Sequence, residues 1–292
     1  MLDKDKAWSK KEDLMHYIEN LDSLIVAFSG GVDSTFLLAV AHQVLGEKVL
    51  AATASSATYP SQEQEEAVQF ARKQGISHVV FESDETCLPA FSENSPDRCY
   101  HCKKLLSQEL LQIAKERGFS NIALAANVDD LGDYRPGITA AEEMGMIEPL
   151  MEAKLTKEEI RFLSKEMTLP TWDKPAMACL ASRIPYGDPV TDEKLKMVEA
   201  AESFLAQNGF RQFRVRHHGA VARIEVDISD LRKMLDKTLR EKIVERFKEI
   251  GFLHIALDLE GYVTGSMNRS LDLKNSHELR ETSDKKQVAR NS

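Results

Sequence analysis

The sequence predicts an α/β protein with a doubly wound parallel sheet, followed by a smaller C-terminal α+β domain. Short apolar runs alternate with amphipathic segments up to residue 173, as in parallel strands that are joined by crossover helices. After residue 191 the order changes to a helix, an alternating hairpin, two helices and a last strand. We therefore expect a first domain at residues 1–173, a linker loop at 174–190 and a second domain at 191–273.

Apolar periodicity and end signals place the elements of the first domain. Strands are predicted at residues 24–28, 49–54, 78–81 and 122–125, with a short fifth strand at 146–150. Helices are predicted at residues 7–21, 33–45, 61–75, 96–117 and 156–167. Ser61 with Gln64, and Thr156 with Glu159, have capping-box spacing, and Ser95 is placed to cap the fourth helix.

Composition limits the class of protein. The chain has 292 residues, a net charge of −9 and 42% apolar residues, so it can build a core but does not favour a large nucleic-acid partner. The charged N-terminus has no secretory signal, and no apolar run reaches the roughly 18 residues of a membrane span. We expect a cytoplasmic protein, in which the four cysteines do not form a disulfide framework. The polar residues 274–292 lack a core stripe and predict a disordered tail.

A glycine turn between the first strand and its helix organises the first domain. Gly30 and Gly31 allow a sharp turn, and the helix start that follows offers free N–H groups to an anion. Ser29 and Ser34 can add hydrogen bonds. Asp33 would repel a phosphate unless a divalent cation such as Mg²⁺ lay between them. The motif lacks the Gly-Lys-Ser/Thr ending of Walker A, and the alternative is a turn with a capping aspartate.

A second polar loop, residues 127–137, follows the fourth strand and should reach the same carboxyl edge of the sheet. It contains three aspartates and an arginine, of which Asp133 and Arg135 suit a metal or a substrate. The alternative is a solvated acidic loop.

The hairpin at residues 211–227, with its turn at His218-Gly219, is predicted to have one apolar and one charged face. We expect Arg214 to lie opposite Arg223 in this hairpin. Like charges across a strand pair are destabilising, so the charged face suggests a bound phosphate. Salt bridges within the face and solvent are the alternative. The residues of the charged face are Arg214, Arg216, Arg223 and Glu225.

Three of the four cysteines form a candidate metal set. Cys99 and Cys102 lie one turn apart near a helix start, where we expect their thiol pKa values to fall. Cys179, in the linker loop, is the candidate third thiolate, whereas Cys87 is read as a small buried hydrophobe. Three thiolates suit a four-iron cluster with one open iron. A zinc site completed by histidine, a redox disulfide and three unconnected cysteines are the alternatives.

These motifs together resemble the LarE family of ATP-dependent sulfur transferases. The Ser-Gly-Gly-Val-Asp-Ser run at residues 29–34 resembles the PP-loop of the ATP pyrophosphatases. The run from Cys179 to Gly187 and the pair Arg214 and Arg216 are the more specific part, and the resemblance extends over nearly the whole chain before the tail. It implies a PP-loop ATP pyrophosphatase fold and a homo-oligomer.

The resemblance also implies a reaction. The family adenylates the carboxylates of pyridinium-3,5-biscarboxylic acid mononucleotide, releases pyrophosphate and makes thiocarboxylates for the nickel-pincer nucleotide cofactor of lactate racemase. Some members sacrifice the sulfur of a cysteine that matches Cys179, and others hold three cysteines around a [4Fe-4S] cluster. Cys99 and Cys102 place this sequence with the second group.

The roles implied for individual residues follow from the same likeness. Catalysis is assigned to Cys179, Asp33, Ser182 and Arg183. ATP is assigned to Ser29, Gly30, Gly31, Asp33, Ser34, Asp133 and Arg135, with Mg²⁺ on Asp33. The cluster is assigned to Cys99, Cys102 and Cys179. The substrate phosphate is assigned to Arg214, Arg216, Arg223 and Glu225.

The expected partners are a small nucleotide substrate and a source of sulfide or sulfur, without nucleic acid or membrane. Three other functions stay open. A transfer-RNA thiolase also uses a PP-loop and cysteines, although the net charge opposes it. An amidating synthetase would have no use for three cysteines. A nucleotide sensor that is not an enzyme would need neither Asp33 nor the thiolates.

Overall fold

The computed structural model describes residues 2–132 and 136–269, and it divides into two compact units, Met1–Glu199 and Ala200–Ser292. The division falls inside helix α9 (Asp192–Gln207), later than the predicted linker loop. Much of that loop belongs to the first unit, because Leu180, Ile184 and Val190 share a small apolar core with Phe91. Asp133, Arg135 and the predicted tail lie outside the described residues.

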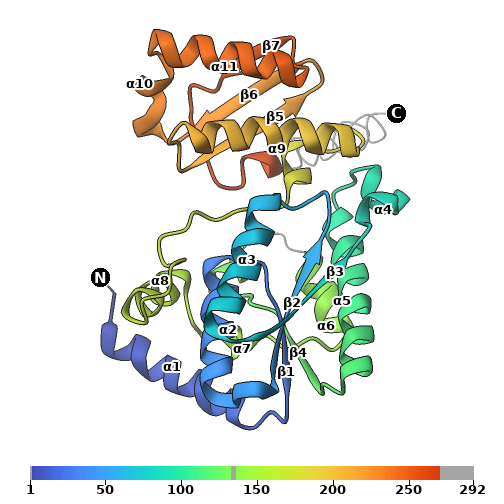
Figure 1. Cartoon of the computed structure of the whole chain (residues 1–292), viewed down its shortest axis with the longest axis vertical. Coiled ribbons are helices and arrows are strands. Elements are labelled where there is room, and N and C mark those ends of the chain that lie inside the picture. Colours follow the sequence, from blue (N-terminus) through green and yellow to red (C-terminus); the bar gives the residue numbers. More distant parts are fainter. Residues whose placement is uncertain (1, 133–135, 270–292) are drawn as a thin grey trace, which may run out of the picture. The chain divides into compact units, whose positions relative to one another are not determined.

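The first unit contains the predicted parallel sheet (Figure 1). Its strands are β1 (Leu24–Ala27), β2 (Val49–Ser55), β3 (Ser77–Glu82) and β4 (Asn121–Ala123), in the order β3-β2-β1-β4. The predicted fifth strand is wrong: a single bridge joins Ala123 to Ile147, and helix α7 (Pro149–Glu152) follows at once. Pro149 has no N–H to donate to a strand ladder, which explains the early end.

Helices cover both faces of this sheet, which confirms the doubly wound architecture (Figure 1). One face packs against α1 (Lys4–Glu19), α2 (Val32–Leu45), α3 (Ser61–Gln74) and α8 (Lys157–Glu166). The other packs against α5 (Arg98–Arg117) and α6 (Pro136–Glu143). Leu24 and Val26 belong to the first core and Ile25 to the second, because successive side chains of a strand point to opposite faces.

Helix ends confirm one of the predicted caps and correct two. The Thr156–Glu159 capping box is present at the start of α8. α3 begins after Pro60 without a side-chain cap, and Ser61 instead donates to Glu199 over 2.6 Å. The helix predicted at residues 96–117 begins at Arg98, after the short helix α4 (Pro89–Ser92), and its N-cap residue makes no side-chain cap.

The second unit is a three-stranded sheet with helices. β5 (Phe213–His218) pairs antiparallel with β6 (Val221–Val226), which pairs parallel with β7 (His254–Leu257). Helices α10 (Leu231–Met234) and α11 (Lys237–Ile250) connect β6 to β7. None of the described helices combines the length and the apolar character needed to cross a membrane.

The predicted hairpin register is wrong by two residues. Arg214 lies opposite Glu225, not Arg223, and Arg216 lies opposite Arg223. The reason is the turn: His218 pairs with Val221, so two residues connect the strands and the pairing shifts. The two faces keep their predicted members, since the shift moves the pairing by two residues.

Candidate active site

The PP-loop, residues 29–34, follows β1 and begins α2. β1 lies between β2 and β4, where the strand order reverses, which is the usual ligand position in a parallel sheet. Gly30 has a φ of +71°, and a Cβ there would lie 3.2 Å from the Cβ of Ala67 on α3. Both facts favour glycine at this position. Gly31 is the N-cap residue of α2 and makes no side-chain cap, so the first N–H groups of that helix suit an anion.

Two of the predicted ATP-binding hydroxyls contact each other. Ser29 Oγ lies 3.1 Å from Ser34 Oγ, and the Gly31 N–H donates to Ser29 Oγ over 3.4 Å. Ser34 Oγ also donates to the carbonyl of Gly31 over 3.3 Å. The PP-loop therefore already has an ordered set of hydroxyl groups beside the helix start.

Asp33 is paired with a lysine, contrary to the exposed carboxylate that the motif suggests. The Lys157 ammonium donates to Asp33 Oδ2, and the Lys157 N–H donates to Asp129 Oδ2 over 2.6 Å. Only 19% of the Asp33 side chain is exposed. Burial raises the pKa of the Asp33 carboxyl, and the Lys157 ammonium opposes this shift without cancelling it. Asp33 Oδ1 is buried and has no hydrogen-bond partner among the described residues.

Lys157 and Lys174 are site residues that the sequence did not reveal. In the sequence, Lys157 is one residue of a capping box and Lys174 opens a loop. In the structure, Lys174 Nζ donates to the Gly30 carbonyl over 3.1 Å and to Glu66 Oε2 over 2.9 Å. The only sequence signal for these two lysines is indirect. A PP-loop that binds an anion predicts basic residues near it, but it does not identify which lysines these are.

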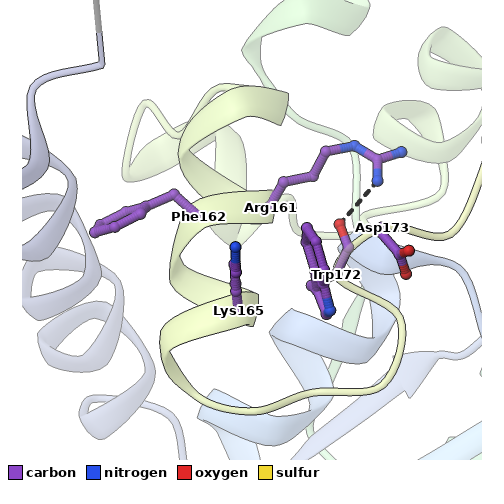
Figure 2. A pocket seen from close by; sticks show the side chains of 5 residues that line it. All are labelled: Arg161, Phe162, Lys165, Trp172 and Asp173. Atoms are coloured by element: carbon purple, nitrogen blue, oxygen red, sulfur yellow. Dashed lines mark hydrogen bonds between the residues drawn. The ribbon is translucent and has the colours of Figure 1, made fainter.

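A pocket of about 280 Å³ lies in the first unit, between side chains of α8 and of residues 172–173, which follow that helix. Figure 2 shows the Arg161 guanidinium reaching the carbonyl of Trp172, over 2.8 Å. The Lys165 ammonium lies 4.6 Å from the centre of the Trp172 ring. The pocket contains none of the predicted site residues. It is lined by Arg161, Phe162, Lys165, Trp172 and Asp173.

The three candidate cysteines share one region of the first unit. The thiols of Cys99 and Cys102, on α5, and of Cys179 lie close enough to influence one another electrostatically. Among residues 2–132 and 136–269, however, no three His, Cys, Asp or Glu side chains are grouped closely enough to hold a metal ion. Cys87 is exposed, which corrects its reading as a buried hydrophobe.

The predicted fall of the thiol pKa is wrong for Cys102. Burial raises the Cys102 pKa far above its ordinary value, and the Cys179 and Glu85 side chains act in the same direction. Burial also raises the pKa of Cys179, opposed first by the Arg98 guanidinium. Desolvation of a thiolate here outweighs any benefit from the start of α5. Cys102 Sγ donates to Oε1 of the fully buried Glu85 over 3.8 Å.

Arg183 shapes the backbone around Cys179. Its guanidinium is fully buried and donates to the carbonyls of Ala178 and Cys179, over 2.5 and 3.1 Å, and to Ser182 Oγ over 3.0 Å. The Leu180 N–H donates to the Thr58 carbonyl over 2.8 Å, which attaches the loop to the segment before α3. The loop that presents Cys179 is thus held on both sides.

The charged face of the second unit is built around a buried carboxylate. Glu225 accepts two hydrogen bonds from Arg216, over 2.9 and 2.8 Å, and one from Arg223 over 3.0 Å. Arg223 also lies 3.5 Å from an oxygen of Asp258. The Arg214 guanidinium lies 5.0 Å from the centre of the Tyr262 ring. Glu225 thereby balances much of the positive charge from which the sequence analysis inferred a bound phosphate.

Comparison with known proteins finds one matching family and several relatives that align with most of the chain. A model of the NAD synthase family matches residues 10–131, which include the PP-loop. The chain is 41% identical over 90% of its length to a protein of Synechocystis sp. described as uncharacterized, of which it covers 98%. It is 34% identical, again over 90% of its length, to the pyridinium-3,5-bisthiocarboxylic acid mononucleotide synthase of Lactiplantibacillus plantarum, of which it covers 95%. A Methanocaldococcus jannaschii protein described as uncharacterized is 28% identical, with 86% of this chain and 95% of that protein covered.

Proposed function

Because the chain belongs to the LarE family, that of the pyridinium-3,5-bisthiocarboxylic acid mononucleotide synthases, we propose that it is an ATP-dependent sulfur transferase with the same substrate. It adenylates the carboxylates of pyridinium-3,5-biscarboxylic acid mononucleotide, releases pyrophosphate and converts the adenylates to thiocarboxylates. The product serves the nickel-pincer nucleotide cofactor of lactate racemase. The observation that carries the proposal is the presence, in one compact unit, of a PP-loop and three neighbouring thiols.

The PP-loop supplies the adenylation site. A carboxylate is a poor acyl donor, and adenylation gives it AMP as a leaving group. The N–H groups at the start of α2, with Ser29 and Ser34, are suited to hold the phosphates of ATP. Stabilising the charge that develops on pyrophosphate would be their main contribution to rate.

The residues around Asp33 fit a magnesium ion. Asp33 Oδ1 is buried without a partner among the described residues, and such an oxygen is suited to a hard cation. Mg²⁺ bound there would neutralise charge on the phosphates. Lys157 stays hydrogen-bonded to Asp33 Oδ2 and so fixes the orientation of the carboxylate. We place both residues in the ATP site.

The thiols of Cys99, Cys102 and Cys179 are the type of donor that a [4Fe-4S] cluster takes, but in this structure they are not grouped closely enough to hold one, so cluster binding requires them to move together. When bound, such a cluster supplies an iron without a protein ligand, which can carry sulfide. Arg98 and Arg183 favour the thiolate form of Cys179. Arg183 positions Cys179 through the backbone, and Ser182 accepts from Arg183. The alternative sulfur source is Cys179 itself, whose thiolate form these arginines favour.

The charged face of the second unit is proposed to bind the phosphate of the mononucleotide. Arg214 and Arg216 are its direct contacts, and Glu225 holds Arg216 and Arg223 in position. Remote binding of this kind orients the reacting carboxylate.

The test is a reaction of the purified chain with ATP, Mg²⁺ and the dicarboxylate mononucleotide. Pyrophosphate release that requires the dicarboxylate, together with a product in which sulfur has replaced oxygen, would support the proposal. Release without sulfur but with nitrogen in the product would indicate an amidating synthetase. Absence of release would favour a nucleotide sensor, and release that requires transfer RNA would favour a thiolase of RNA.

A further inference from the structure

Lys174 connects the PP-loop to the segment that presents Cys179. Its ammonium donates to the carbonyl of Gly30 in the PP-loop and to Glu66 on α3, and Glu63 lies 3.8 Å away. Only 17% of the Lys174 side chain is exposed. Burial would raise the pKa of Glu66, but the hydrogen bond and the charge of Lys174, together with a hydrogen bond from Gln62, outweigh burial and lower the pKa. The lysine is therefore a charged partner both to the PP-loop and to α3.

The backbone on either side of Lys174 is attached at defined points. Arg161 donates to the carbonyls of Trp172 and Lys174, over 2.8 and 2.7 Å. At the other end, the Leu180 N–H donates to Thr58, next to Cys179. Pro175 fixes one backbone dihedral between these points. Residues 172–180 are therefore attached near both ends, and Lys174 lies within this attached segment.

We propose that Lys174 is a positioning residue which couples nucleotide binding at the PP-loop to the placement of Cys179. Its ammonium lies 3.1 Å from the loop that would receive the phosphates. Phosphate oxygens carry more negative charge than the Gly30 carbonyl and form charge-assisted hydrogen bonds. When ATP binds, the ammonium exchanges Glu66 for a phosphate oxygen, and residues 172–180 are drawn onto the PP-loop. The sulfur site then assembles only when the acyl-activating nucleotide is present.

This inference rests on the proposed function, since it requires ATP at the PP-loop. The full-length chain, as purified, is tested with Mg²⁺ and a non-hydrolysable ATP analogue. Hydrogen exchange of the peptide covering residues 172–180 is measured with and without the nucleotide, because exchange reports local opening. The wild-type segment should exchange more slowly with nucleotide bound.

Lys174→Met removes the charge and keeps the length of the side chain. It should weaken nucleotide binding by about tenfold, as expected for one lost charged hydrogen bond, and it should abolish the slowing of exchange at saturating nucleotide. Lys165→Met is the matched control. Lys165, on α8, stacks on Trp172 of the 172–180 segment, and none of its described contacts is to the PP-loop. This variant should therefore still show slower hydrogen exchange when nucleotide binds.

A second variant covers the case in which Lys174→Met does not fold. Glu66→Gln removes the competing carboxylate and leaves the lysine intact, so nucleotide should bind more tightly and still slow the exchange. Wild-type chain that binds nucleotide without slower exchange would overturn the coupling alone. The same conclusion follows if Lys174→Met keeps the slowing, or if Glu66→Gln leaves the affinity unchanged. Wild-type chain that binds no nucleotide would overturn the proposed function as well.

Discussion

Lys157 donates a hydrogen bond from its ammonium to one carboxylate oxygen of Asp33, while the other oxygen of Asp33 is buried without a partner among the described residues. This relationship joins the first turn of α2 to the first turn of α8. Oδ2 is therefore already oriented by Lys157, whereas Oδ1 makes no hydrogen bond to the described residues and can still bind a cation. A cation that enters the site thus meets a ligand in a defined orientation.

We predict that Asp33→Ala abolishes pyrophosphate release and leaves the fold intact. Loss of the magnesium ligand removes charge stabilisation from the leaving group. Asp33→Asn is the matched variant, because it keeps the size of the side chain and one acceptor oxygen but removes the charge and the second acceptor. Pyrophosphate release and thermal unfolding of both variants are the measurements. A folded Asp33→Ala chain with unchanged release would contradict the assignment of the ATP site.

Lys157→Met should lower the rate of adenylation by about ten- to a hundredfold, since a charged hydrogen bond contributes roughly 1.5–3 kcal/mol. The reason is that Asp33 then loses the partner that orients it. Lys154→Met serves as a nearby control, since the side chain of that exposed residue makes none of the contacts described for the ATP site. Equal rates in the two variants would show that Lys157 has no part in the reaction.

Arg214→Ala and Arg216→Ala should weaken binding of the mononucleotide by about ten- to a hundredfold for each lost charged hydrogen bond. Arg216→Ala should also destabilise the fold, by up to about 3–5 kcal/mol, because Glu225 would remain buried with Arg223 as its only partner described here. Adding Glu225→Gln should restore much of the stability but not the binding. Substrate titration and denaturant unfolding separate the two effects. If ATP binding weakens instead, the arginines serve the other nucleotide.

The thiol pKa values predict a reactivity order in cluster-free, reduced chain. Cys102 and Cys179 have raised pKa values, so their thiolate fraction at neutral pH is lower than that of an ordinary thiol. Their alkylation should become fast only at a pH above the ordinary thiol value of about 8.5, whereas the exposed Cys87 reacts earlier. Peptide mass spectrometry after timed alkylation gives the rates. In denaturant all four should react alike, and a native Cys102 that reacts as fast as Cys87 would contradict its burial.

The last prediction concerns the source of the transferred sulfur. If Cys99, Cys102 and Cys179 hold a [4Fe-4S] cluster, replacing any one of them should lower both iron content and thiolation, whereas Cys87→Ala should change neither. Product should exceed one per chain when sulfide is supplied, without loss of mass from Cys179. Iron and sulfide analysis after anaerobic purification, with intact-protein mass, tests this. A Cys179 that loses sulfur while Cys99→Ala and Cys102→Ala still complete one turnover would establish the sacrificial route.

The sequence by itself determined the features that depend on neighbouring residues. The PP-loop was predicted from an apolar run, two glycines and a helix start, and its conformation is set within those residues. The Thr156–Glu159 capping box was predicted for the same reason, since both hydrogen bonds close over three residues. The alternation of strands and helices likewise follows from local periodicity. The two faces of the hairpin were also correct, because side chains alternate along each strand and the error in register was an even number of residues.

Only the tertiary structure decided which distant groups meet and how solvent is excluded from them. Lys157 reaches Asp33 and Lys174 reaches Gly30 from far along the chain, and no local spacing encodes either contact. The start of a helix suggested a lowered thiol pKa for Cys102, but burial raised it, because the cost of desolvating a thiolate depends on everything packed around it. The PP-loop is thus a local property of the sequence, whereas the charges that tune it come from the fold.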